Sequence, residues 1–465
     1  MLRDNMKTLA EAAALIEGGR LSPVEATREL LSRIDTLDLR LNSYISVQGD
    51  RALERARRAE REIASGDYRG RLHGMPIAVK DLLEMAGTRT TVGSRALYEW
   101  TPDRHATVVR RLEEAGAVIL GKLNMTEFAM GWYHPKMPIP KNPWAEDRWA
   151  GASSSGTGVA VAAGLAMAGI GSDTGGSIRL PSACCGVTGI KPTFGVVSRH
   201  GVFPLASSFD TVGPMARSVE DAAIMLDAMA GFDDADADSV PGLAGNYRAA
   251  VGGDVRGIRI GVDACYIQCD SDPEVSRAVL AAIDTLGELG AELVEVEMPI
   301  LEGEEETWTT ITSVDALHAH RDLYADRTED YGPFAELLER ARATRPEDYA
   351  MARERGRRFS GLLRRVYERV DVIACPSLAV LPVPVGEDGF GLWEGMGPWY
   401  RFSIPFNFSK NPTVSVPCGL STDGLPASLQ LIGRHFDEHS IIALADAYQK
   451  ATDWHLLHPP GMDAD

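Results

Sequence analysis

The stretch "GASSSGTGVAVAAGLAMAGIGSDTGGSIR" (residues 151–179) joins two Gly/Ser clusters through a run of small apolar residues. Its central part, "VAVAAGLAMAGIGSD", is typical of a buried helix followed by a short strand. The second cluster, "GSDTGGSIR" (171–179), holds three glycines and two serines. Because glycine carries no Cβ, this density indicates a backbone that must come close to another group.

Strand and helix patterns alternate on both sides of this stretch. "GMPIAVKD" (74–81) is typical of a buried strand, and "ATVVRRLEEAGAVILGKL" (106–123) of a helix followed by a strand. Sheet-like sequence returns at "GIRIGVD" (257–263) and "DVIACPS" (371–377). The alternation predicts an α/β fold in which helices cover both faces of a sheet.

Composition narrows the classes of function. The chain of 465 residues has a net charge of −19, from 66 acidic and 47 basic residues. That balance argues against nucleic acid or an anionic membrane surface as a partner. No uncharged run reaches the length of a membrane span, and the N-terminus lacks the apolar stretch of a signal peptide. Six cysteines do not make a disulfide framework, so we expect a cytoplasmic protein.

The sequence predicts no metal site. The acidic stretch 231–242 is similar to a calcium loop, but Ser239 replaces the turn glycine and Gly245 replaces the bidentate glutamate. We expect a solvated connection there instead. Cys265 and Cys269 have no second Cys or His pair nearby that would complete a zinc set.

The two Gly/Ser clusters suit acyl transfer better than phosphate binding or a linker. They lack the spacing of a phosphate-binding loop, and they adjoin apolar helix and strand sequence. Acyl transfer needs a hydroxyl nucleophile, a base and backbone N–H groups aimed at the oxyanion. None of the ten histidines lies in or beside either cluster, so Lys80, at the end of an apolar strand, is the candidate base. Burial there would lower its pKa from about 10.4 toward neutrality.

Blocks of sequence along most of the chain resemble the amidase signature family of Ser-cisSer-Lys amidohydrolases. They are "LHGMPIAVKDLLEMAGTRTTVGS" (72–94), "GAVILGKLNMTEFAMG" (116–131), "GASSSGTGVAVAAG" (151–164), "GSDTGGSIRLPSACCGVTGIKPTFGVVSRHG" (171–201) and "SSFDTVGPMARSVEDAA" (207–223). The resemblance implies one large α/β domain over residues 1–465, with a mixed sheet of about eleven strands. It would comprise N-terminal helices (1–70), a catalytic core (71–230) and a variable helical insert (300–370) near the substrate pocket.

The resemblance also implies roles for individual residues. Lys80 matches the base, Ser153 the bridging serine on a cis peptide, and Ser177 the nucleophile. The expected oxyanion hole consists of the backbone amides of Thr174, Gly175, Gly176 and Ser177, and the expected supporting residues are Ser154, Asp173 and Arg179. The implied reaction requires no cofactor and no metal.

The substrate is the least determined part of the prediction. The expected pocket residues are Met130, Trp132, Tyr133, Trp308, Trp399 and Phe402, which favour a small, aromatic or apolar amide, carbamate or ester. Homodimers are common in the family. An alternative is the A subunit of the aspartyl/glutamyl-tRNA amidotransferase, a glutaminase that supplies ammonia to a partner. Leu180 stands where those subunits usually carry glutamine, which favours the stand-alone hydrolase. An inactive binding protein is disfavoured by the complete Lys80, Ser153 and Ser177 set.

Overall fold

One mixed sheet of eleven strands organises the protein. The structure, a computed structural model, describes residues 8–242, 245–391 and 397–462. The order across the sheet is β1-β3-β2-β4-β6-β5-β10-β11-β9-β7-β8. The strands are β1 (Tyr44–Val47), β2 (Pro76–Lys80), β3 (Val118–Leu123), β4 (Ala168–Asp173), β5 (Thr188–Lys191), β6 (Thr211–Ala216), β7 (Arg259–Val262), β8 (Glu292–Glu295), β9 (Val372–Pro376), β10 (Thr413–Leu420) and β11 (Pro426–Gly433).

Parallel and antiparallel pairs alternate along the sheet in blocks. β2 runs parallel to both β3 and β4, and β7 runs parallel to both β8 and β9. The block between them, from β4 through β6, β5, β10 and β11 to β9, is antiparallel. Strands from before and after the acidic stretch 231–242 therefore belong to the same sheet.

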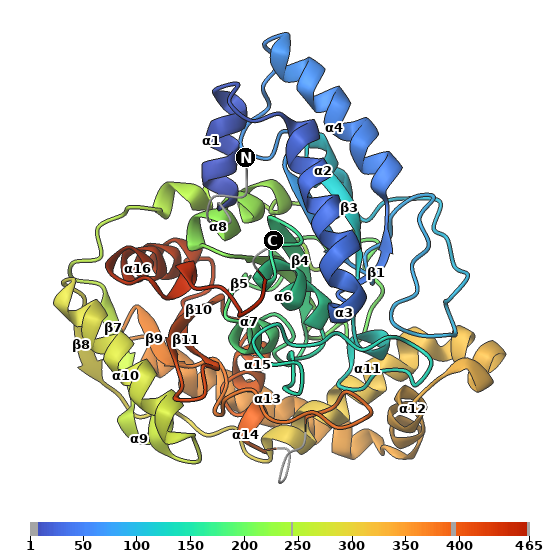
Figure 1. Cartoon of the computed structure of the whole chain (residues 1–465). Coiled ribbons are helices and arrows are strands. Elements are labelled where there is room, and N and C mark those ends of the chain that lie inside the picture. The colour runs from blue at the N-terminus through green and yellow to red at the C-terminus, as the bar shows by residue number, and fades with distance from the viewer. Residues whose placement is uncertain (1–7, 243–244, 392–396, 463–465) are drawn as a thin grey trace.

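Helices pack against the sheet in two groups, and further helices lie at both ends of the molecule (Figure 1). The α-helices are α1 (Leu9–Glu17), α2 (Pro23–Arg33), α3 (Leu39–Leu41), α4 (Gly49–Ala64), α5 (Thr107–Glu114), α6 (Ser155–Ala162), α7 (Arg179–Cys185), α8 (Val219–Met229), α9 (Ala264–Gln268), α10 (Pro273–Glu288), α11 (Glu304–Arg327), α12 (Phe334–Ala343), α13 (Pro346–Val366), α14 (Gly397–Tyr400), α15 (Ile404–Phe408) and α16 (Glu438–Ala451).

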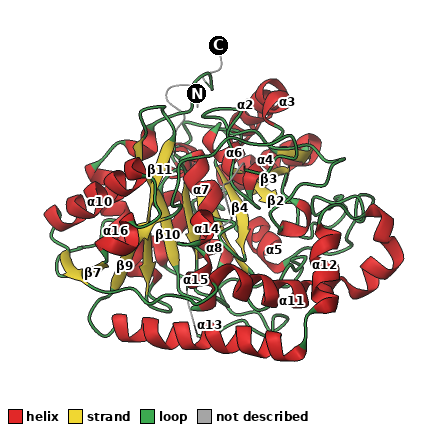
Figure 2. Ribbon diagram, turned by 90° about the horizontal axis from the view of Figure 1, so that it is seen from below, coloured by secondary structure: helices red, strands yellow, loops and turns green. Residues whose placement is uncertain are grey.

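The arrangement places the small-residue helices at the centre of the molecule. α6 and α7 pack against each other and against β4, β5, β10 and β11, whereas α8 and α16 pack together against β6, β10 and β11. The N-terminal helices α1, α2 and α4 lie at one end and α11, α12 and α13 at the other (Figure 1). Figure 2 shows α13 running along the edge opposite the N-terminal helices.

The predicted α/β class, with one mixed sheet and helices on both faces, is confirmed. The strands expected within 74–81, 257–263 and 371–377 are β2, β7 and β9, and the helical segment 300–370 contains α11, α12 and α13. The N-terminus of α2 is determined locally: Ser22 caps it, Pro23 takes the first helical position, and Glu25 completes a capping box.

The acidic stretch 231–242 is mostly exposed, as expected of a solvated connection, but two of its acidic side chains are not. Asp233 and Asp236 are buried, and their carboxylates accept hydrogen bonds from the Ser198 hydroxyl at 2.6 Å and the Arg199 amide at 2.7 Å. The stretch is therefore packed against the segment that follows β5, because short acidic side chains can satisfy nearby donors as well as face water.

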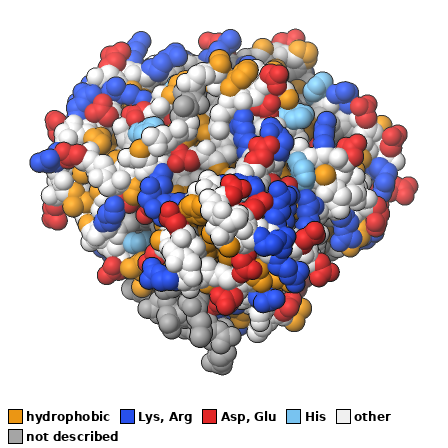
Figure 3. Space-filling model, turned by 90° about the horizontal axis from the view of Figure 1, so that it is seen from above, with side chains coloured by type: hydrophobic (Ala, Val, Ile, Leu, Met, Phe, Trp, Pro, Cys, Tyr) orange, Lys and Arg blue, Asp and Glu red, His pale blue; other side chains and the backbone are white. Residues whose placement is uncertain are grey.

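The surface carries charges of both signs. Figure 3, which looks onto the end where α1, α2 and α4 lie, shows Lys and Arg side chains interspersed with Asp and Glu. No helix in the described ranges combines the length and the apolar character that crossing a bilayer requires.

Candidate active site

Lys80 lies at the carboxyl end of β2, in the interior of the sheet. β2 is flanked by β3 and β4, and all five of its residues are buried. Because β2 and β4 are parallel, their carboxyl ends meet at one edge, which brings Lys80 beside Ser172 and Asp173. The Lys80 side chain is completely buried.

Three serine hydroxyls surround the Lys80 amine. Its Nζ lies 2.7 Å from Ser153 Oγ, 2.9 Å from Ser154 Oγ and 2.9 Å from Ser172 Oγ. Ser153 and Ser154 directly precede α6, and the peptide bond between Ala152 and Ser153 is cis. None of the ion pairs among the described residues includes Lys80.

The hydrogen bonds of Ser154 leave the hydroxyls of Ser153 and Ser172 as those that can donate to a neutral amine. Ser154 Oγ donates to the Ser172 carbonyl at 3.2 Å, so it accepts from Lys80. A neutral amine has two hydrogens and one lone pair, and the Ser153 hydroxyl is free to donate its proton to that lone pair. Burial lowers the pKa of Lys80 from 10.5 to about 7, although Asp173 and Asp210 act in the opposite direction.

The loop after β4 carries Ser177 and requires glycine at two positions. A Cβ at Gly175 would lie 2.7 Å from Trp308 Cζ2. Gly176 has φ +133°, and a Cβ there would lie 2.8 Å from Ser403 Oγ. The stretch is rich in small residues because the loop packs closely against α7, α11 and the segment before α15. Ser177 itself is only half-buried, unlike its immediate neighbours.

The Asp173 carboxylate holds this loop from within. It accepts hydrogen bonds from the backbone amides of Gly176 at 3.0 Å and Ile178 at 3.1 Å. Arg179 pairs with the same carboxylate through two nitrogens, at 2.8 Å and 3.0 Å, and both side chains are completely buried. Burial alone would raise the pKa of the Asp173 carboxyl, but the Arg179 guanidinium holds it below its ordinary value.

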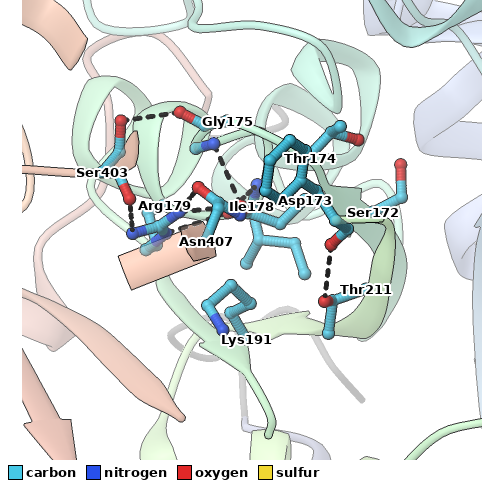
Figure 4. A network of polar contacts seen from close by, with 12 residues as sticks. Ser172, Asp173, Thr174, Gly175, Ile178, Arg179, Lys191, Thr211, Ser403 and Asn407 are labelled. Atoms are coloured by element: carbon cyan, nitrogen blue, oxygen red, sulfur yellow. Dashed lines mark hydrogen bonds and ion pairs between the residues drawn. The ribbon is translucent and has the colours of Figure 1, made fainter. Parts of the chain in front are cut away.

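Residues from the last third of the chain complete this network, as Figure 4 shows. Asn407 Nδ2 donates to Asp173 Oδ1 at 2.8 Å, and its Oδ1 accepts from Arg179 Nη2 at 2.7 Å. Arg179 Nη1 donates to the Ser403 carbonyl at 2.8 Å and to Gln430 Oε1 at 3.2 Å. The loop conformation therefore depends on α15 and β11 as well as on β4.

Two further contacts orient the peptide groups of the loop. Trp308 Nε1 donates to the Thr174 carbonyl at 2.9 Å, and Ser403 Oγ donates to the Gly175 carbonyl at 2.6 Å. Thr174 Oγ1 also donates to Asp210 Oδ1 at 2.6 Å. Fixing these carbonyls fixes the direction of the amides that follow them. Within the described chain, the amides of Gly175 and Ser177 donate to no protein acceptor.

A narrow cavity opens beside Ser177. Its volume is about 20 Å³, enough for roughly one water molecule. Thr174, Gly175 and Ser177 line it together with apolar and aromatic residues that include Met130, Ala152, Leu180, Leu205, Trp308, Trp399 and Tyr400. No charged side chain of the described residues lines it.

The structure brings together the predicted Lys80, Ser153, Ser154, Asp173, the 174–177 loop and Arg179, but only half of the predicted pocket residues. Met130, Trp308 and Trp399 line the cavity. Trp132, Tyr133 and Phe402 are not among the residues that line this cavity, and their place in a substrate pocket stays a prediction. Trp132 packs against Phe390, the Tyr133 hydroxyl donates to Ser155 Oγ at 2.6 Å, and the Phe402 ring packs against Tyr266.

Several residues of the site were not assigned from the sequence. Ser172 and Asp210 lie inside quoted blocks, so their sequence context offered a signal. Gln430 lies in the block "GLPASLQLIG" (424–433), which also resembles the family, whereas Ser403 and Asn407 have no such context, since only the fold brings them to Arg179. Among the residues that the structure describes, no group of three or more His, Cys, Asp or Glu side chains is placed to hold a metal ion.

Comparison with known proteins identifies the class. The family model described as Amidase matches residues 25–442. AmiD of Mycobacterium tuberculosis (strain ATCC 25618 / H37Rv) is 42% identical over 461 residues, which cover 97% of this chain and 95% of that protein. The A subunit of the Glutamyl-tRNA(Gln) amidotransferase of Roseiflexus castenholzii is 39% identical, with 97% of each chain covered.

A solved structure of the same family also matches this chain. That of a bacterial aryl acylamidase of the amidase signature family superposes with a TM-score of 0.89, at 26% identity and with 98% of each chain covered. The chain belongs to the amidase signature family, and the resemblance inferred from its sequence blocks is confirmed.

The buried Asp173–Arg179 pair generates a stability prediction. Asp173→Asn keeps the shape of the side chain but leaves the Arg179 guanidinium buried without its counter-ion. We expect the free energy of unfolding to fall by about 3–5 kcal/mol, measured by urea denaturation. The matched control is Asp254→Asn, at a solvent-exposed pair with Arg256, which should produce no measurable change. Equal stability of Asp173→Asn and the wild type would contradict a structural role for the pair.

Proposed function

We propose that the protein is an amidohydrolase that cleaves the C–N bond of a neutral amide through an acyl-enzyme on Ser177. The observation that carries the proposal is the completely buried Lys80 amine, 2.7 Å from Ser153 Oγ. An amine with a pKa of about 7 is a substantial fraction neutral at physiological pH and can act as a general base.

In the proposed reaction, protons move along a relay of three side chains. Ser177 Oγ attacks the carbonyl carbon while Ser153 takes its proton and passes its own proton to Lys80. When the C–N bond breaks, the proton returns from Lys80 through Ser153 to the departing nitrogen. Water then attacks the ester on Ser177 by the same relay, and the acid leaves with Ser177 restored.

The proposed oxyanion hole differs slightly from the one implied by sequence resemblance. The amide of Gly176 donates to Asp173, so we assign the oxyanion to the amides of Thr174, Gly175 and Ser177. Each such donor is worth roughly 3–4 kcal/mol of barrier when it is aimed at the developing charge. The hydrogen bonds that Trp308, Ser403 and Asp210 make with Thr174 and Gly175 keep these amides oriented.

The proposed substrate is small, neutral and apolar or aromatic near the scissile bond. Aromatic and aliphatic side chains line most of the cavity, and a charged group placed against them would lose its hydration without a partner. Carbamates and esters of the same shape present the same carbonyl to Ser177, so they belong to the proposed substrate class. Because the cavity of about 20 Å³ holds roughly one water molecule, any of these substrates requires side chains that line it to move.

The amidotransferase A subunit is the second candidate, favoured by the relative from Roseiflexus castenholzii. That role would need glutamine as the ammonia source and a partner subunit. Glutamine carries an ammonium and a carboxylate, whereas the described residues that line the cavity offer neither charge a partner. The composition of the cavity therefore favours the hydrolase.

A parallel assay of the purified chain separates the two candidates. We expect kcat/KM for neutral anilides or short apolar amides to exceed that for glutamine by at least about 100-fold, because glutamine must desolvate two charges. Ser177→Ala should lower kcat by on the order of 10⁴-fold or more and abolish labelling by a fluorophosphonate.

Cys184→Ala is the control for an alternative nucleophile. Burial raises the pKa of the Cys184 thiol, which keeps it protonated, so this variant should retain activity within a few-fold. Strong glutaminase activity with none on the amides would instead support the amidotransferase role, and full activity of Ser177→Ala would exclude the acyl-enzyme.

The proposed base generates a pH prediction. Lys80 must be neutral to accept a proton, and its amine becomes protonated as the pH falls through about 7. We therefore expect kcat/KM to rise with pH to a plateau above about 8, and to fall about tenfold per pH unit below the midpoint near 7. The measurement is the pH profile of kcat/KM for the best substrate of the panel.

Lys191 provides the matched control, because burial lowers its pKa to about 7 as well. Its Nζ donates to the Asn411 carbonyl at 2.5 Å and does not contact the three serines around Lys80. Lys191→Met should keep the midpoint near 7, whatever its effect on the height of the plateau. Loss of the acidic limb in Lys191→Met would assign the titration to Lys191 and contradict the role of Lys80.

A further inference from the structure

A second hollow lies between α13, α11 and the segments that contain Phe209 and Lys410. Its volume is about 340 Å³, which is sufficient for a small organic molecule. It shares no lining residue with the cavity beside Ser177. The proposed hydrolase does not use it.

All four charged residues that line this hollow are basic. Arg353, Arg357 and Arg364 line it from α13. Spacings of four and seven residues place all three on one face of a helix. Lys410 lines it from the segment between α15 and β10.

Three of these four cations have no carboxylate partner among the described residues. Arg345 and Arg355, also close to or on α13, pair with Asp348 and Glu306, whereas no ion pair of the described residues includes Arg358 or Arg365. In the described part of the chain, no ion pair joins Arg353, Arg364 or Lys410 to a carboxylate, although Arg357 pairs with Glu354. Such a grouping is unexpected in a chain with 66 acidic and 47 basic residues.

Two carboxylates near the hollow, those of Asp238 and Asp315, accept hydrogen bonds from, or pair with, residues other than the four cations that line it. No Asp or Glu of the described residues lines it. Asp315 accepts hydrogen bonds from the Ser208 amide and the Tyr349 hydroxyl, and Asp238 pairs with Arg199. By contrast, a surface hollow beside α1 and α16 is lined by charges of both signs, including Glu11, Arg71, Asp446 and Lys450.

Two aromatic residues that line the hollow, Phe209 and Phe408, pack against each other. The rings of Phe209 and Phe408 meet edge to face with centroids 4.9 Å apart. α13 lies directly on Phe408, since a Cβ at Gly356 would be 2.2 Å from Phe408 Cδ1. Lys410 also lies against an aromatic ring, with its Nζ 3.6 Å from the centroid of Phe194. Cationic side chains and a packed aromatic pair therefore line the same hollow.

We propose that this hollow is a binding site for a small organic phosphate with an apolar body. The arginines of α13 and Lys410 would hold the phosphate, for which Arg offers paired N–H donors. The apolar body would rest on Phe209 and Phe408. A ligand so placed would touch the segment that leads to Asp210, whose carboxylate holds Thr174 at the Ser177 loop.

Calorimetric titration of the full chain with phenyl phosphate tests this site. We expect saturable binding that weakens with added salt and is tighter than binding of inorganic phosphate or phenol. Arg353→Gln/Arg364→Gln should weaken the binding of phenyl phosphate by at least about tenfold. The matched control is Arg358→Gln/Arg365→Gln, two arginines of the same helix that do not line the hollow, which should leave the affinity within about twofold.

A further experiment tests this site independently of the proposed hydrolase activity. Prior labelling of Ser177 by a fluorophosphonate should leave phenyl phosphate binding unchanged, so the result does not depend on catalysis. The proposal is overturned if no binding is measurable at millimolar phenyl phosphate, or if both double variants lose affinity equally. It is also overturned if phenol, or inorganic phosphate, binds as tightly as phenyl phosphate.

Discussion

A lysine amine enclosed by hydroxyl groups, at the end of an interior strand, is the constraint on which the rest of the site depends. A charged ammonium in this position loses its hydration, and among the described residues no carboxylate pairs with it. The three serines that surround Lys80 Nζ supply hydrogen bonds without supplying negative charge. That combination favours the neutral amine, which is the form that can accept a proton.

The sheet and the helices can be understood as the support for this environment. β2 and β4 run parallel, so Lys80 and Ser172 arrive at the same edge. The cluster before α6 supplies Ser153 and Ser154, and α6 consists of small residues that allow close packing. The Ser177 loop is then fixed by Asp173, Arg179 and the C-terminal residues that meet them. A site built on several rigid elements keeps its geometry better than one built on a single loop.

Features formed by consecutive residues can be predicted from the sequence. The apolar strand ending in Lys80 and the two Gly/Ser clusters gave the fold class, and the order of the blocks gave the family. Sequence reasoning was weakest where distant segments meet. Nothing near Asn407 or Gln430 indicates a contact with Arg179, because that contact exists only after β10 and β11 join the sheet.

The pocket shows the same limit in another form. Trp132, Tyr133 and Phe402 are aromatic residues in the expected segments, yet each has another partner. Composition identifies which segments can reach a pocket, whereas side-chain direction decides which residues line it. The ring of Trp308 is an expected part of the pocket. Its Nε1 also donates to the Thr174 carbonyl and so orients the loop, which no sequence pattern indicates.

The most direct measurement of the central claim is the titration of Lys80 itself. Lysine labelled with ¹³C at Cε reports the protonation of each amine by NMR, and the spectrum of Lys80→Met assigns the Lys80 signal. The account predicts a midpoint near 7 for that signal. A midpoint near the ordinary value of about 10.4 would mean that the amine stays charged at physiological pH, and would contradict the account.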